Sequence, residues 1–234
     1  MTRSSSKTPA RLPAFLASTN AAASVEFLIF APVLIIMLLA GFEVSRMVAA
    51  QRHLATFTSS VAWDLAGTND QDANGKTIAK GFRLYEFATR LGLLMPEVWK
   101  PGVSVYAGHS RYNIAMTMVQ MTPTVANCSS NCTYIANVAW SWGDMNRSCG
   151  QLGSVTDGSA YDKAKLPNGA FQAGAVVVVD VKVEYPSILN LSWLPARTFT
   201  YSVYFPVRNT IGGAYLPWDG VANWWSGAKC AGYT

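Results

Sequence analysis

The chain is poor in charge and almost without histidine. Asp, Glu, Lys and Arg make up 13% of its 234 residues, and only two histidines are present; ordinary globular domains carry about 25% charged residues. The sequence has no G-x-S-x-G, no phosphate-binding glycine loop and no H-E-x-x-H, the patterns that position a nucleophile, a phosphate or a zinc ion. It therefore predicts a protein that is not an enzyme and holds no cofactor, with much apolar surface to cover.

Acidic residues are absent from the first 25 positions, which carry Arg3, Lys7 and Arg11. Without these three cations the formal net charge of +5 falls to +2, so the rest of the chain has no excess of positive charge typical of a nucleic-acid partner. Positive charge ahead of an apolar run favours a cytoplasmic N-terminus, with the following residues on the other side of the membrane.

The apolar run extends from Ala21 to Phe42 and carries one charge, Glu26. As a helix, its 22 residues measure ~33 Å, enough to cross a hydrocarbon core of ~30 Å. A carboxylate inside such a span costs roughly 2.5–3.5 kcal/mol at the midplane, so Glu26 needs a partner. Beyond the run, apolar residues recur every three or four positions, which predicts one helix from Ala22 to Ala66 with an amphipathic outer part.

A family resemblance rests on these residues. AAASVEFLIFAPVLIIMLLAGFEVSR, residues 21–46, resembles the N-terminus of TadE/TadF-like minor pilins of tight-adherence (Tad, Flp-type) pili. The family resemblance implies that a prepilin peptidase removes a basic leader before a helix whose fifth residue is glutamate. A cut between Ala21 and Ala22 makes Glu26 the fifth residue, although the family usually has glycine where this chain has Ala21.

The resemblance also implies a role and partners. It indicates a structural minor pilin (pseudopilin) of the bacterial inner membrane, with Glu26 acting in assembly with other pilin subunits and the inner-membrane assembly platform. The head is then periplasmic and enters the initiation, tip or assembly of a pilus. The alternative is a bitopic inner-membrane protein whose periplasmic head binds a partner or ligand without polymerising; a signal-peptidase cut after Ala50 is a further alternative.

The remaining residues predict an α+β head. A second helix is expected over 77–94, after which the apolar period changes from 3.6 to 2 in the segments 103–106, 112–118, 134–142, 180–185 and 198–207. Such alternation favours an antiparallel sheet with one buried face. The predicted organisation is a leader over 1–21, a pilin-like transmembrane helix over 22–66 and a head over 67–234.

Two polar segments and a tryptophan-rich tail complete the head. The connector 144–172 is rich in Gly and Ser, and we expect it to form an exposed, variable surface. Asp70, Asp72 and Asn74 fit the first half of a calcium loop, but Gly81 stands where the bidentate Glu belongs, so a polar turn is favoured over a metal site. For the tail 215–234, with Trp218, Trp224 and Trp225, core packing is favoured over a docking patch.

All four cysteines follow the apolar run, on the side expected to be oxidising: Cys128, Cys132, Cys149 and Cys230. An even number there predicts two disulfides, whereas zinc is disfavoured because neither histidine is close in sequence. Three pairings are open. Because the shortest ring costs least entropy to close, we expect Cys128–Cys132 with Cys149–Cys230.

Overall fold

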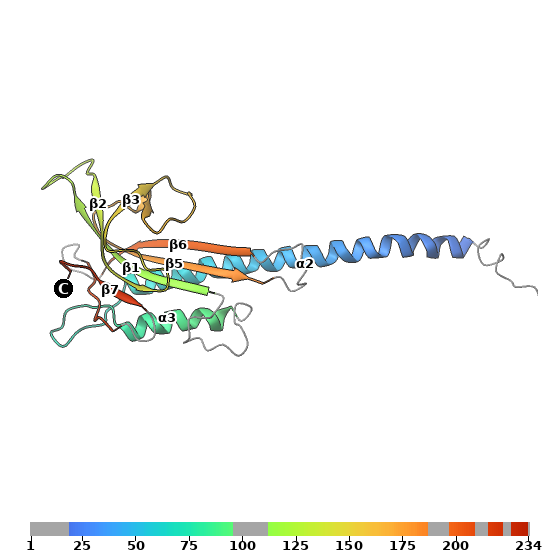
Figure 1. The fold of residues 1–234 in the computed structure, drawn as a ribbon, viewed down its shortest axis with the longest axis horizontal. Coiled ribbons are helices and arrows are strands. Elements are labelled where there is room, and N and C mark those ends of the chain that lie inside the picture. The colour runs from blue at the N-terminus through green and yellow to red at the C-terminus, as the bar shows by residue number, and fades with distance from the viewer. Residues whose placement is uncertain (1–18, 96–111, 187–196, 209–214, 222–225, 234) are drawn as a thin grey trace, which may run out of the picture. The chain divides into compact units, whose positions relative to one another are not determined.

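The computed structural model describes residues 19–95, 112–186, 197–208, 215–221 and 226–233 (Figure 1). The chain divides into two units, Met1–Arg46 and Met47–Thr234. The expected strand at 103–106 lies outside the described residues, as do the side chains of Ala21 and Ala22.

The first helix, α2, runs from Thr19 to Ala66 over 48 residues, with Pro32 inside it. Its length confirms the prediction of one continuous helix. In the unit that starts at Met47, the buried positions of α2 follow a spacing of three or four: Ala50, Leu54, Phe57, Val61 and Leu65. This is one face of a 3.6-residue helix, and it supplies one side of the head's main core.

The second helix, α3, extends from Gly81 to Leu94, shorter than the expected 77–94. Residues 77–79 are extended, since Thr77 bridges Gln71 and Ala79 bridges Trp218. Lys80 gives no side-chain cap. Instead, the Gly81 N–H donates to Asp219 Oδ2 at 3.0 Å. The N–H groups of the first helical turn have no partner within the helix, and here a carboxylate 138 residues away in the sequence accepts one of them.

In its described residues, the head forms a sheet of seven strands, ordered β4-β3-β2-β1-β5-β6, with β7 also pairing β2. The long strands are β1 (Tyr112–Pro123), β2 (Tyr134–Gly143), β5 (Gly174–Tyr185) and β6 (Arg197–Pro206). The short strands are β3 (Gly150–Val155), β4 (Lys165–Pro167) and β7 (Gly227–Lys229), and η3 (Asn168–Ala170) is a 3-10 turn. The α+β class is confirmed, but the sheet is mixed because β3 and β4 run parallel.

One face of the sheet packs on α2 and α3. The predicted face of β1 is confirmed, since Tyr112, Ile114, Met116 and Met118 all lie in the core shared with the helices. The predicted face of β2 is wrong. The register with β1 shifts between Met118 and Val119, and such a bulge exchanges the faces of the residues beyond it. Trp140 and Trp142 therefore join the helix-side core, whereas Ala136 and Val138 join a second core.

The second core covers the other face of the sheet, so the expectation of one buried face is wrong. Leu152, Leu166 and Ala170 from the connector 144–172 pack there against Val176 and Val178. Most residues of the connector are exposed, as predicted, although the segment also contains β3, β4 and η3. Trp218 is 4% exposed and belongs to the helix-side core, as expected, whereas Trp224 and Trp225 lie outside the described residues.

Candidate functional site

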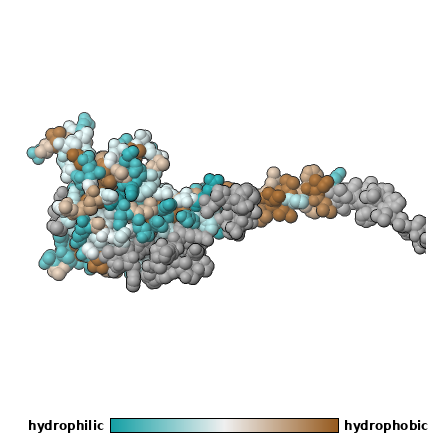
Figure 2. Space-filling model, in the orientation of Figure 1, coloured by the Kyte–Doolittle hydropathy of each residue, from teal (hydrophilic) through white to brown (hydrophobic). Residues whose placement is uncertain are grey.

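The N-terminal part of α2 presents apolar side chains on all its sides. From Phe27 to Phe42, its large apolar residues are between 43% and 74% exposed, and hydrophobic colour covers this part of the helix in Figure 2. The helix is long and apolar enough to cross a membrane. Side chains of this kind are favoured in lipid or against other apolar helices.

Glu26 is the acidic residue of this apolar surface. Its side chain is exposed, and the described part of the chain gives it no hydrogen bond or ion pair. Ala22 and Glu26 both lie inside α2, so their spacing of four residues places them one turn apart on the same side of the helix. The structure thus confirms the helical spacing on which the predicted roles of Ala21, Ala22 and Glu26 rest; the roles themselves stay predictions.

The segment with Asp70, Asp72 and Asn74 uses its carboxylates within the chain. Asp72 Oδ1 accepts the N–H of Asn74 at 2.8 Å and that of Lys76 at 2.9 Å, as in an Asx turn. Asp70 pairs instead with Arg83 of α3 at 3.3 Å. No cluster of three or more His, Cys, Asp or Glu side chains suited to a metal occurs in the described residues.

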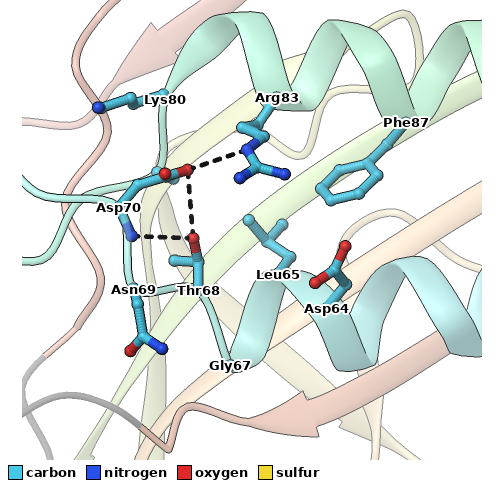
Figure 3. Close-up of a pocket in the computed structure, with 10 residues that line it drawn as sticks. Asp64, Leu65, Gly67, Thr68, Asn69, Asp70, Lys80, Arg83 and Phe87 are labelled. Carbon is cyan, nitrogen blue, oxygen red and sulfur yellow. Dashed lines mark hydrogen bonds and ion pairs between the residues drawn. The ribbon is translucent and has the colours of Figure 1, made fainter.

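Asp70 and Arg83 line a hollow of about 280 Å³ between the end of α2 and the start of α3. Figure 3 shows the two side chains directed toward each other, with the Thr68 hydroxyl beside the Asp70 carboxylate. Asp64 and Lys80 add one charge of each sign to the lining. Because the charges are balanced and Asp70 already has a cationic partner, this hollow favours no particular ion.

Both predicted disulfides are present. Cys128 pairs with Cys132 in the connection between β1 and β2, and Cys149 pairs with Cys230 across 81 residues. The second bridge links the residue before β3 to the residue after β7, two strands that both pair with β2. It therefore joins the connector to the C-terminal segment.

A buried ion pair was missed by the sequence analysis. Arg147, from the connector, donates through Nε to Asp180 Oδ2 at 2.8 Å and through Nη2 to Oδ1 at 3.0 Å, and both side chains are at most 2% exposed. Arg147 Nη1 also donates to the carbonyl groups of Asp162, Lys163 and Lys165. One guanidinium thus fastens the connector to the sheet.

Two hydroxyl residues complete the surroundings of this ion pair. Ser202 Oγ lies 2.6 Å from Asp180 Oδ1, and the Arg147 guanidinium lies 5.5 Å from the centre of the Tyr161 ring. Burial, with the Asp180 charge acting in the same direction, raises the pKa of Tyr161 to about 12. The Tyr161 hydroxyl is therefore protonated at neutral pH, and every charge in the cluster is either paired or exposed.

These features define the class: an α+β protein with one apolar N-terminal helix that is able to span a membrane. Residues 21–62 match the family described as TadE-like protein, which confirms the resemblance noted for this segment and connects the chain with the Tad pilus systems. The match covers the apolar helix and part of its continuation into the head. No curated protein and no solved structure matches the chain.

Proposed function

We propose that this chain is a structural minor pilin (pseudopilin) of a Tad-type pilus, acting in pilus initiation, tip or assembly after prepilin-peptidase processing. The observation that carries the proposal is the coincidence of the TadE-like match with an exposed apolar helix that holds Glu26. In this proposal the protein is not an enzyme. Its head is periplasmic, its leader is cytoplasmic, and its partners are other pilin subunits, the inner-membrane assembly platform and the prepilin peptidase.

The chemistry of Glu26 supports an assembly role. A cut between Ala21 and Ala22 creates an amine on Ala22, one turn from the Glu26 carboxylate in α2. In a lone subunit the carboxylate lies near its own helix N-terminus, where negative charge is favoured. In a growing pilus the same carboxylate pairs with the amine of a neighbouring subunit, and this pairing matters because an unpaired charge in low dielectric is costly.

The construction of the head supports a structural role. Each face of its sheet is packed against other elements, two disulfides close its connections, and the connector is fastened by a buried ion pair. These are properties of a rigid body carried on a helix. The apolar side chains of α2 between Phe27 and Phe42 remain available to lipid and to the helices of other pilins.

The processing step tests the proposal most directly. We expect protein purified from membranes that contain the prepilin peptidase to begin AASVEF, and protein from cells without it to begin at Met1. Ala21→Phe replaces the small residue before the cut and is expected to block it. Ala40→Phe makes the same change at an exposed position inside the apolar helix, far from the cut, and is expected to be processed.

Two outcomes contradict the proposal. If the purified protein begins at Met1 in cells with an active peptidase, the result favours a bitopic membrane protein whose head binds a partner without polymerising. A start at Gln51 means that the apolar helix is a signal sequence removed from the mature protein.

A further inference from the structure

A hollow of about 430 Å³ opens between β6 and the connector. Residues 157–162 of the connector line one side of it, and Thr200, Ser202 and Tyr204 of β6 line the other. Tyr204 also packs against the second core, so the hollow lies on the sheet face that the connector covers. Small-molecule sites in proteins have volumes of about 300–1,000 Å³. The hollow is therefore large enough to hold a small ligand.

The inner wall of the hollow is fixed by groups that already have partners. Arg147 lines the hollow with a side chain that is only 2% exposed, because its guanidinium is held by Asp180 and by three carbonyl groups of the connector. The hydroxyl of Ser202 lies 2.6 Å from Asp180 Oδ1. Because the two buried charges neutralise each other, they hold the wall in place without attracting an ion into the hollow.

Two tyrosine side chains give the hollow flat apolar surface. Tyr161 comes from the connector and Tyr204 from β6, and both line the hollow. The centre of the Tyr161 ring lies 5.5 Å from the Arg147 guanidinium, and Tyr204 packs against the second core, so both rings are positioned without a ligand. A tyrosine combines a large apolar body with a polar tip. The two rings suit a ligand that has an apolar face and polar edges.

Asp157 supplies a carboxylate without a cation. Its Oδ1 accepts the Gly169 N–H at 3.0 Å, and none of the ion pairs among the described residues involves it. Asp162, the other carboxylate of the lining, pairs with Lys165 at 3.5 Å. An ionised carboxylate accepts hydrogen bonds at both oxygens and donates none. Asp157 therefore favours a ligand that has hydrogen-bond donors.

The backbone of β6 adds donors and acceptors beside the hollow. The strand is the last in the sheet order and pairs with β5 without interruption. The Val207 N–H donates to the Ala175 carbonyl, so the odd-numbered residues of β6 exchange hydrogen bonds with β5. The N–H and C=O groups of Thr200 and Ser202 then point away from β5, and no described residue pairs with them.

We propose that this hollow binds the ring of a neutral sugar. The rings of Tyr161 and Tyr204 pack against the carbon-bound hydrogens of the sugar, which form its apolar surface. The Asp157 carboxylate accepts hydrogen bonds from sugar hydroxyl groups, and the N–H groups of Thr200 and Ser202 donate to the hydroxyl oxygens. A hydroxyl both donates and accepts, so one kind of group satisfies both sides of the hollow.

Other ligand classes fit the hollow less well. An anion is repelled by Asp157, since the two cations of the lining, Arg147 and Lys165, already have acidic partners. An apolar ligand would cover Asp157 and the open backbone groups of β6 without replacing their hydrogen bonds to water, which is unfavourable. A cation would pair with Asp157 but leave the N–H groups of β6 without acceptors. The inference does not depend on the pilin proposal, because every group that it uses lies in the head.

Saturation-transfer NMR on the full-length protein tests the site. The probes are the methyl glycosides of glucose, galactose, mannose and N-acetylglucosamine, whose rings stay closed as they are in a glycan. The protein is kept in a polyoxyethylene detergent, because a head group that is neither a sugar nor a cation cannot compete for the hollow. We expect saturation to pass from the protein to the ring hydrogens of at least one glycoside, and a titration then gives its Kd.

Removing the charge of Asp157 is the first change to test. Asp157→Asn keeps an oxygen that can accept the Gly169 N–H, so we expect an unchanged melting temperature. Because hydrogen bonds to a charged group are the stronger ones, we expect the glycoside to bind roughly tenfold more weakly. The matched control is Asp72→Asn. Asp72 also accepts backbone N–H groups but does not line the hollow, so its Kd is expected to equal that of the unchanged protein.

The aromatic contact is tested separately. Tyr161→Leu removes the ring and is expected to weaken binding roughly tenfold, whereas Tyr161→Phe keeps the ring and is expected to change the Kd by less than about twofold. Tyr134→Leu is the control, since Tyr134 is another partly buried tyrosine beside the second core and does not line the hollow. If Asp157→Asn does not fold, the two Tyr161 variants decide the question in its place.

The contradicting outcomes are distinct. Absence of saturation transfer to all four glycosides overturns the proposal. Equal binding by the unchanged protein, Asp157→Asn and Tyr161→Leu also overturns it, because the sugar then binds elsewhere. Tetramethylammonium is the probe for a cation. If it binds more tightly than every glycoside and loses its binding in Asp157→Asn, the occupant is a cation and not a sugar.

Discussion

At the scale of single residues, Asp180 illustrates how one charge fixes the layout of the head. It is fully buried in β5, yet both of its oxygens bind Arg147 and one also binds Ser202. A buried carboxylate without a cation is strongly unfavourable. The pair with Arg147 therefore determines which part of the connector lies over the second face of the sheet.

Removing the charge of Asp180 tests this role. Asp180→Asn keeps the shape but leaves the Arg147 guanidinium buried without its anion, so we expect a loss of roughly 3–5 kcal/mol in unfolding free energy. Ser202→Ala removes one hydrogen bond to the same carboxylate and is expected to cost only about 0.5–1.5 kcal/mol. Denaturant unfolding of the purified protein, followed by tryptophan fluorescence, measures both. Equal costs for the two variants would contradict the assignment.

Glu26 gives the second prediction at this scale. Glu26→Gln keeps the size of the side chain and removes its charge, so membrane insertion and disulfide formation in the head are expected to stay normal. Pilus output and co-purification with other pilins are expected to fall, because the variant cannot pair with a neighbouring amine. Glu86→Gln makes the same change in α3, outside the TadE-like match, and serves as the control. Normal piliation with Glu26→Gln would favour a plain membrane anchor.

At the scale of elements, the outcome of each sequence prediction follows from whether its signal is local. The stripe along α2 repeats every three or four residues, so the sequence predicts the helix and its buried face from neighbours alone. The face of the sheet on which Trp140 lies depends on a bulge between β1 and β2. The sequence of one strand alone does not predict that bulge. Likewise, Asp180 alternates with Lys182 as a polar face would, but a distant segment covers it.

A signal for the buried ion pair does exist in the sequence. Asp180 interrupts a run of valines, Val176 to Val181, and a carboxylate in such a run implies burial with a cationic partner. Which cation serves was not predictable, because Arg147 lies 33 residues away in a segment whose composition resembles an exposed loop.

The start of α3 supplies a prediction for an element. At Gly81 an added Cβ would clash with the Val221 carbonyl oxygen, so Gly81→Ala must displace a backbone segment. Although alanine favours helices over glycine by about 1 kcal/mol, we expect a net loss of roughly 1–3 kcal/mol from overpacking. Gly41→Ala, also inside a helix but with nothing within 4 Å of the added atom, is the control and is expected to cause no loss. Thermal melting compares them, and an unchanged Gly81→Ala protein would refute the close approach.

At the scale of the whole molecule, the two units satisfy their apolar residues in different ways. In Met1–Arg46 the large apolar side chains from Phe27 to Phe42 are exposed, which suits lipid or partner helices. In Met47–Thr234 they fill two cores on the two faces of one sheet. The disulfides lie entirely in the second unit, so oxidation stabilises the head and leaves the apolar helix unconstrained.

The two disulfides are expected to contribute unequally to the stability of the head. In the chain-entropy account, a bridge over 81 residues stabilises by about 4–5 kcal/mol and one over four residues by about 2 kcal/mol. Cys230 is also 6% exposed and packs in the second core, whereas the Cys128–Cys132 bridge closes a surface connection.

Replacing Cys149 and Cys230 together by serine is therefore expected to lower the melting temperature far more than replacing Cys128 and Cys132. Melting of the oxidised proteins measures the difference, with reductant on the native protein expected to reproduce the sum of both losses. Equal melting temperatures for the two double variants would show that the long bridge does not hold the connector to the C-terminal segment.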